Sequence, residues 1–152
     1  MQLDSIDLKI LEILQADATT SVQDVADKVG LTNNPCWRRI KKLESSGVIL
    51  RRSAIINHAA IGLATVAFVS IKIDSHNKEW LVNFADAIES IPEIVECHRM
   101  SGDIDYLLKI LARDLSHYDS IYQRIITLIP GLKDVSSKFS MEQLKTSDRI
   151  GN

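Results

Sequence analysis

The sequence has few of the residues that cross-link or interrupt small proteins. Its two cysteines, Cys36 and Cys97, lie far apart in a chain of 152 residues and show no Cys-x-x-Cys spacing. This scarcity argues against a disulfide scaffold and against a zinc site, and it suits a reducing compartment. Six glycines and three prolines are also few. Together with a hydrophobic content of 45%, this composition predicts a packed globular protein.

The sequence also lacks a hydrophobic run long enough to enter a membrane. The longest apolar-leaning stretch, Ala59 to Ile71, has 13 residues, and a bilayer crossing needs about 18. The N-terminus carries Asp4, Asp7 and Lys9, where a signal peptide requires a basic start followed by an apolar core. We therefore expect a soluble cytoplasmic protein with no membrane partner.

Signatures of catalysis and of metal binding are missing as well. No Gly-rich phosphate loop and no nucleophile motif occurs. The histidines show no close metal-ligand spacing; they are His58, His76, His98 and His117. We expect neither a metal nor a cofactor, and we do not expect an enzyme.

Positive charge is concentrated in one segment of a chain whose net charge is −2. Between Cys36 and Arg52 there are six basic residues, and Glu44 is the only acid. Beyond Ile56 the chain has ten basic and thirteen acidic residues. Such asymmetry indicates a basic contact surface attached to a more neutral module.

Helical periodicity and capping residues predict three helices around this basic segment. Asp4 is a candidate N-cap for the first helix, and Ser21 with Asp24 opens the second, which Gly30 ends. The third runs from Thr32 to Gly47 and places a Cys36, Ile40 and Leu43 stripe on one face. Cys36 is expected to pack as a small hydrophobe.

Two helices joined at Gly30, the second of them basic, are typical of a helix-turn-helix, whose second helix enters the DNA major groove. The alternative is an ordinary solvated face, which most charge runs are. Arg39 lies nearer the core face, so we expect it to be structural. Arginine can pair with guanine, asparagine with adenine and lysine with phosphate. The predicted DNA-contact residues are Thr32, Asn33, Asn34, Trp37, Arg38, Lys41, Lys42, Arg51 and Arg52.

The second half of the chain changes its period and predicts an α+β domain. Strands are expected at 65–73, 94–100, 106–112 and 135–141, and helices at 78–91 and 115–129, in the order β-α-β-β-α-β. Residues 49–56 are expected to be extended. Trp80 and Phe84 are expected to lie in a core or an interface. We divide the chain into a DNA-binding domain at 1–56, a linker at 57–64, a ferredoxin-like domain at 65–145 and a tail at 146–152.

The predicted first strand of this domain has apolar residues on both faces. Val66 and Phe68 lie on one side, and the other side carries Ala67, Val69, Ile71 and Ile73. Because two helices cover only one face of the sheet, the other face needs a partner. A homodimer is the simplest supplier.

The predicted hairpin contains two carboxylates, Asp103 and Asp105, in the sequence SGDIDY. Paired carboxylates can serve acid–base catalysis. Aspartate beside glycine is, however, ordinary turn chemistry, so both readings stand at this point.

Four stretches of the chain resemble the Lrp/AsnC family of bacterial transcription regulators. They are LDSIDLKILEILQADA, LTNNPCWRRIKKLESSGVI, IPEIVECHRMSGDIDYLLKI and IPGLKDVSSKFSMEQLK, which together span nearly the whole chain. The resemblance implies an N-terminal winged helix-turn-helix and a C-terminal ferredoxin-like RAM domain that binds an effector, usually an amino acid. It also implies dimers that assemble into octamers or similar rings.

The chain departs from the family pattern at Thr32-Asn33-Asn34, where members usually have serine and small residues or proline. The operator sequence is therefore left open. Trp37 after Cys36 is similar to a subgroup that includes regulators of cysteine catabolism.

The resemblance places an effector pocket at the hairpin, between subunits. Asp103 or Asp105 would hold an ammonium group, and backbone N–H groups near Gly102 would hold a carboxylate. The implied pocket residues are Met100, Ser101, Gly102, Asp103, Asp105, Tyr106, Ser136 and Ser137. Alternatives are an architectural DNA-binding protein without an effector, and a metabolic enzyme with a vestigial DNA module.

Overall fold

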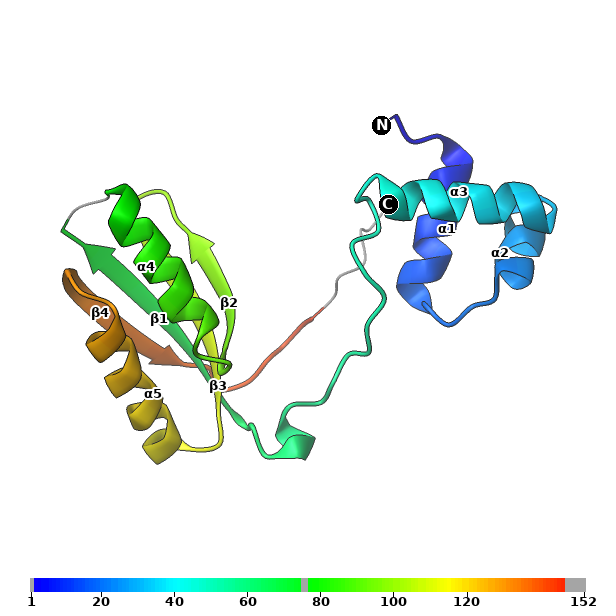
Figure 1. The fold of residues 1–152 in the computed structure, drawn as a ribbon. Coiled ribbons are helices and arrows are strands. Elements are labelled where there is room, and N and C mark those ends of the chain that lie inside the picture. Colours follow the sequence, from blue (N-terminus) through cyan, green and yellow to red (C-terminus); the bar gives the residue numbers. More distant parts are fainter. Residues whose placement is uncertain (1, 75–76, 147–152) are drawn as a thin grey trace. The chain divides into compact units, whose positions relative to one another are not determined.

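Three short helices form the N-terminal part of the chain, and a four-stranded sheet with two helices forms most of the remainder (Figure 1). The computed structural model describes residues 2–74 and 77–146. Contacts divide the chain into two compact units, with the boundary between Ile55 and Ile56, and the second unit extends to Leu144. The segment 57–64, predicted as a linker, falls within the second unit and contains the short helix η1 (Ala59–Ile61). His76 and residues 147–152 of the predicted tail lie outside the described residues.

The three N-terminal helices begin and end at the residues that local chemistry favours. Helix α1 (Ser5–Ala16) has a capping box, in which the Asp4 carboxylate accepts from the backbone N–H of Asp7 and the Asp7 carboxylate accepts from that of Asp4. At α2 (Val22–Val29) the Ser21 hydroxyl oxygen accepts from the Asp24 N–H. Gly30 ends α2 at a φ of +74°, a left-handed conformation that costs a glycine little. The predicted caps are confirmed.

The core of this unit joins one face of each helix. Helix α3 (Asn33–Ser45) contributes Cys36, Ile40 and Leu43, which confirms the predicted stripe. Cys36 is fully buried, and burial raises the pKa of its thiol, as expected for a cysteine that packs as a small hydrophobe. The other buried members are Ile10, Leu14, Val25 and Ala26.

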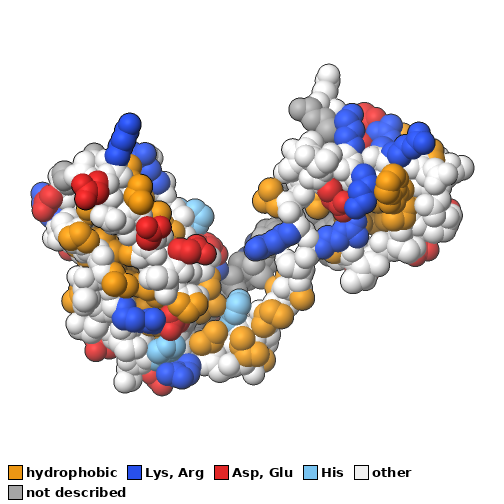
Figure 2. All heavy atoms as spheres, in the orientation of Figure 1, with side chains coloured by type: hydrophobic (Ala, Val, Ile, Leu, Met, Phe, Trp, Pro, Cys, Tyr) orange, Lys and Arg blue, Asp and Glu red, His pale blue; other side chains and the backbone are white. Residues whose placement is uncertain are grey.

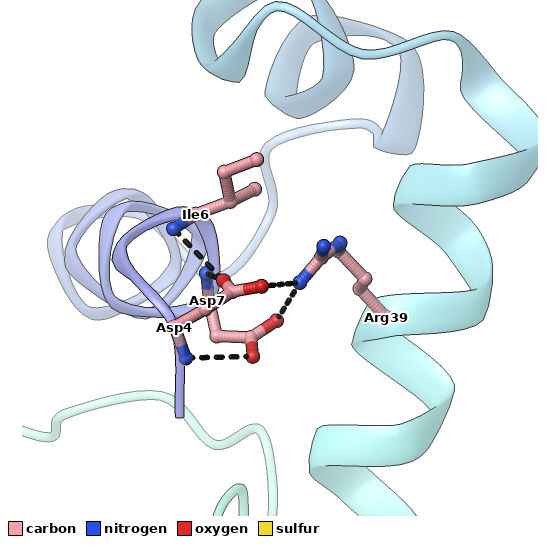
Figure 3. Close-up of polar contacts among 4 residues, drawn as sticks. All are labelled: Asp4, Ile6, Asp7 and Arg39. Carbon is pink, nitrogen blue, oxygen red and sulfur yellow. Dashed lines mark hydrogen bonds and ion pairs between the residues drawn. The ribbon is translucent and has the colours of Figure 1, made fainter. Parts of the chain in front are cut away.

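An ion-pair network attaches α3 to the start of α1 (Figure 3). A single nitrogen of Arg39, Nη1, lies 2.7 Å from an oxygen of Asp4 and 2.7 Å from an oxygen of Asp7. Asp7 is buried. The backbone N–H of Asp7, and after it Arg39, holds the pKa of Asp4 below its ordinary value. The structural role expected for Arg39 is confirmed.

The second unit is a four-stranded antiparallel sheet in the order β2-β3-β1-β4. Both helices lie on the same face of the sheet (Figure 1). This is the predicted β-α-β-β-α-β arrangement. Its elements are β1 (Thr65–Ile73), α4 (Lys78–Glu89), β2 (Ile94–Arg99), β3 (Tyr106–Ala112), α5 (Leu115–Leu128) and β4 (Leu132–Phe139).

Two predicted elements differ from the structure. The last strand was expected at 135–141 but begins at Leu132, because its backbone pairs with β1 from Ile73 onward. The polar side chains of Lys133 and Asp134 conceal this pairing in the sequence. The stretch 50–57, all of it described, contains no helix or strand, so the extended segment expected at 49–56 forms no ladder within the chain.

The core of the second unit lies between the sheet and the two helices. Three aromatic rings pack together there: Trp80 and Phe84 are stacked with centroids 4.9 Å apart, and Phe84 lies 4.4 Å from the Tyr106 ring. The Trp80 indole N–H donates to the carbonyl oxygen of Pro130 at 2.7 Å, which ties α4 to the turn before β4. Trp80 and Phe84 are therefore core residues, one of the two roles predicted for them.

The opposite sheet face carries the alternate residues of each strand. In the register of the sheet, Phe68 lies opposite Lys109 and Lys138, and Val66 lies opposite Leu111. Phe68 is 38% exposed. Lys109 pairs with Glu96 across β3 and β2 at 2.9 Å. Among the described residues of this unit, neither helix packs on this face, so it combines apolar side chains with an exposed ion pair.

We predict that Arg39→Ala destabilises the N-terminal unit by about 1–2 kcal/mol, because the buried Asp7 carboxylate loses its cation. The stability of the variant should also fall less than that of wild type when the pH is lowered. Since the pKa of Asp4 is lowered, its interactions stabilise the fold above the ordinary value of 3.8 and are lost as the pH falls through the lower folded value. Urea denaturation at neutral and acidic pH, followed by circular dichroism, measures both effects.

Two variants serve as controls. Arg39→Lys should lose less stability, because both contacts are made by one nitrogen, which an ammonium group can replace. Arg38→Ala removes a neighbouring charge from an exposed position and should leave stability near that of wild type. Equal stability of Arg39→Ala and wild type would contradict the role of the network.

Candidate DNA interface and effector site

Helix α3 presents a polar face to solvent because its opposite face is buried. Its N-cap, Thr32, makes no side-chain capping bond, and Pro35 lies in the first turn, where its missing N–H costs nothing. Asn34, Trp37, Arg38 and Lys41 are exposed. Figure 2 shows Lys and Arg side chains gathered on the face of this unit that carries α3.

Asn33 has a local partner although it is exposed. Its side-chain amide donates to the Gln23 side-chain oxygen at 3.1 Å. This bond connects the first turn of α3 to α2 and orients the start of the helix. Thr32 and Asn34, the neighbours of Asn33 in the sequence, are also exposed.

Glu44 contacts two of the predicted DNA-contact cations. The Lys41 ammonium group donates to its Oε2 at 2.8 Å, and Arg52 donates to its Oε1 at 3.3 Å. Arg52 also donates to the Ala18 carbonyl oxygen at 3.3 Å, between α1 and α2. The hydrogen bond from Lys41 is the main reason that the pKa of Glu44 lies below its ordinary value.

The six cations of the basic segment therefore fall into two sets. Arg39, Lys41 and Arg52 are paired with carboxylates of the chain. The second set forms no ion pair within residues 2–74 and 77–146 and is exposed; its members are Arg38, Lys42 and Arg51.

The hairpin between β2 and β3 is closed by backbone bonds and leaves its tip exposed. The Met100 N–H donates to the Asp105 carbonyl oxygen at 2.9 Å. Gly102 has a φ of +101°, a conformation that side chains disfavour. Ser101, Gly102 and Asp103 are exposed, so the tip can be approached by a ligand.

The second carboxylate of the hairpin has a structural contact. The Asp105 Oδ2 atom accepts from the backbone N–H of Ile73 at 2.9 Å, and the Asp105 N–H donates to the Ile71 carbonyl oxygen at 2.8 Å. These bonds continue the pairing of β1 with β3 past its last residue pair. Asp105 therefore shapes the hairpin, and the sequence contained no sign of this contact.

Three other predicted pocket residues have side chains that make contacts elsewhere in this unit. Tyr106 is buried at 5% exposure in the aromatic core, because its side chain lies on the helix-covered face. Ser136 pairs with Ser70 in the ladder and accepts on its carbonyl oxygen from the Ser70 hydroxyl at 3.3 Å. Ser137 forms a hydrogen bond with the Tyr118 hydroxyl.

Within one chain, β1 separates β4 from the hairpin strands. Ser136 and Ser137 also alternate between the two faces of the sheet. A single chain therefore does not gather the predicted effector residues into one pocket. Within the described residues no group of three or more His, Cys, Asp or Glu is placed to hold a metal ion.

Two family models match the chain, one for each unit. Residues 3–49 match a model described as winged helix-turn-helix DNA-binding, and residues 66–150 match one described as the Lrp/AsnC ligand binding domain. The chain belongs to the Lrp/AsnC family. Its fold, a winged helix-turn-helix followed by a ferredoxin-like domain, is the one that the resemblance implied.

Relatives of known structure and name support the same assignment. The chain is 43% identical over 143 residues to the DNA-binding transcriptional activator DecR of Escherichia coli, covering 94% of each chain. It is 47% identical to an AsnC family transcriptional regulator from Agrobacterium tumefaciens, with a TM-score of 0.91 over 98% of this chain and 97% of that one. The L-Met complex of a Neisseria meningitidis transcriptional regulator is 27% identical, with a TM-score of 0.90 over 99% and 97%.

This Lrp/AsnC member is a DNA-binding transcriptional regulator with a domain for a small-molecule effector. None of the helices in the described part of the chain combines the length and the apolar character that crossing a bilayer requires.

Proposed function

We propose that this Lrp/AsnC regulator reads its operator with the exposed face of α3 and changes its DNA affinity or assembly when an amino acid binds. The proposed DNA contact rests on the orientation of α3. Its Cys36, Ile40 and Leu43 face is buried against α1 and α2, which leaves the polar face for DNA. The protein is proposed to act as a cytoplasmic regulator and not as an enzyme.

The exposed residues of α3 fit distinct parts of duplex DNA. Arg38, which is exposed and forms no ion pair in the described part of the chain, suits a bidentate contact to guanine, and Asn34 suits adenine. The remaining cations suit phosphate contacts, which position the helix without reading sequence. We assign this role to Lys41, Lys42, Arg51 and Arg52.

The effector is proposed to bind at the hairpin tip. The exposed Asp103 carboxylate suits an α-ammonium group, and backbone N–H groups near Gly102 suit a carboxylate. Asp103 is favoured over Asp105 because the Asp105 carboxylate accepts a bond from Ile73. The L-Met complex of the Neisseria meningitidis relative supports an amino acid as the class of ligand.

Assembly is proposed to begin with a homodimer formed through the open face of the sheet. Val66 and Phe68 lie on this face, and Phe68 is 38% exposed. A second copy would remove these side chains from water. Dimers would then assemble further, to an octamer or a similar ring, and bring residues such as Ser136 of one copy toward the hairpin of another. Half-sites would lie about one helical turn apart, or a multiple of it, to match a two-fold axis.

We predict that Arg38→Ala weakens operator binding by about 1–3 kcal/mol and relaxes the base preference, because a bidentate base contact is lost. Lys41→Ala should weaken binding to all sequences about equally and flatten the salt dependence. Binding-site selection from random duplexes, followed by titration at several salt concentrations, separates the two effects. If Arg38→Ala selects the wild-type site with wild-type affinity, Arg38 does not read a base.

For the dimer, we predict that Phe68→Asp produces a monomer, because the variant loses the apolar contact of Phe68 and adds a carboxylate that costs free energy to desolvate. Val82→Asp is the matched control, since Val82 is an exposed residue of α4 on the other side of the sheet. Sedimentation velocity at micromolar concentration distinguishes the species. A wild-type protein that sediments as a monomer would rule out this interface.

For the effector, we predict that Asp103→Asn and Gly102→Val abolish the change in DNA binding caused by an amino acid and leave ligand-free DNA binding intact. A Cβ at Gly102 would meet no atom within 4 Å, so Gly102→Val causes no steric clash within the chain. It acts through backbone strain, because valine disfavours the positive φ of this position. A panel of amino acids is titrated by calorimetry and by gel shift. Asp105→Ala is the comparison, and it should lower the stability of the second unit through loss of the Ile73 bond. Unchanged ligand affinity in Asp103→Asn and Gly102→Val would move the site elsewhere.

A further inference from the structure

Glu44 is the only acid of the basic segment between Cys36 and Arg52. It lies in the last turn of α3, and its side chain is 29% exposed. A carboxylate at this position is unfavourable for a surface that approaches phosphate, because like charges repel there.

The contacts of Glu44 go to two cations that the proposed function assigns to phosphate. The Glu44 Oε2 atom lies 2.8 Å from the Lys41 ammonium nitrogen, and its Oε1 atom lies 3.3 Å from a guanidinium nitrogen of Arg52. These two side chains come from different parts of the interface, one from the helix and one from the segment that follows it. A single carboxylate therefore partly neutralises both.

Anchoring of the segment after α3 does not depend on Glu44 alone. Arg52 also donates to the Ala18 carbonyl oxygen at 3.3 Å, and the Val48 and Ile49 N–H groups donate to the Leu43 carbonyl oxygen at 3.0 Å. Lys41 is one helical turn from Glu44 and needs no partner to remain on the exposed face. The presence of Glu44 is therefore better explained by its electrostatic effect on Lys41 and Arg52 than by a role in positioning them.

We infer that Glu44 sets the DNA affinity of this regulator by holding Lys41 and Arg52 in internal ion pairs, which limits its sequence-independent attraction to phosphate. This inference rests on the proposed DNA-binding role of α3. Arg38, the candidate base-reading residue, forms no ion pair in the described part of the chain. Restraint of the phosphate contacts lowers binding to all sequences by about the same factor and leaves the proposed base contact of Arg38 unaffected.

The test compares Glu44→Gln with wild type on a fluorescently labelled duplex of arbitrary sequence, because the effect is independent of sequence. Glutamine keeps the size of the side chain and removes its charge. We expect binding to tighten about threefold to tenfold at low salt. The slope of log affinity against log salt should steepen by about one to two, as freed cations displace more counterions. Fluorescence anisotropy over a series of salt concentrations measures both quantities.

Glu12→Gln is the matched control. It removes the same charge from an exposed position on α1 without touching Lys41 or Arg52, and it should leave affinity and slope near wild type. In a Lys41→Ala background, Glu44→Gln should give a smaller gain than in wild type, because one of its two pairs is already absent. Thermal melting verifies that each variant is folded.

Affinity and slope of Glu44→Gln equal to wild type would overturn the inference. Weaker binding would also overturn it, because it would mean that Glu44 positions the two cations for DNA. A gain of the same size in Glu12→Gln would reduce the effect to net charge and overturn it too. Failure of wild type to bind any duplex would instead refute the proposed function.

Discussion

Burial of one face of α3 is the constraint on which the proposed DNA interface depends. Cys36, Ile40 and Leu43 pack against α1 and α2, and a helix with one face buried can present only the other to a partner. The side chains proposed to face DNA are therefore selected by the hydrophobic core and not by the basic residues themselves. Arg39 reinforces this choice, because its ion pairs with Asp4 and Asp7 attach the middle of α3 to the start of α1 (Figure 3).

The effective positive charge of this surface depends on which cations form ion pairs as well as on how many there are. Asp4 and Asp7, at the start of α1, pair with Arg39, and Glu44 pairs with Lys41 and Arg52. The net attraction of the surface for phosphate is thus smaller than its six cations suggest. Since phosphate contacts carry no sequence information, this pairing lowers the affinity for all duplexes alike.

In the second unit, too, one face is buried within the chain and another is exposed. Both helices cover one face of the sheet, so the aromatic core of Trp80, Phe84 and Tyr106 is complete within one chain. The opposite face and the hairpin tip are left for partners. Since β1 separates β4 from the hairpin strands, the proposed effector site would draw on more than one copy of the chain. In the proposed assembly, ligand binding and subunit contacts would then be coupled.

The sequence alone determined the elements and their order, because periodicity and capping are local. The N-caps at Asp4 and Ser21, the stop at Gly30 and the buried stripe of α3 all follow from residues within a few positions of one another. The β-α-β-β-α-β order followed from the periodicity of each segment, and the family followed from four motifs in series. Even the Lys41–Glu44 pair is readable, since the two residues are three apart on a helix.

Tertiary structure decided what depends on distant residues meeting. The Asp105 bond to Ile73, the contact between Ser137 and Tyr118, and the reach of Arg39 to α1 join residues separated by 19 to 35 positions. The start of β4 was set by its pairing with β1 and not by its own polar residues. Strand pairing and side-chain contacts across such separations depend on how elements pack, and no local pattern of the sequence records that packing.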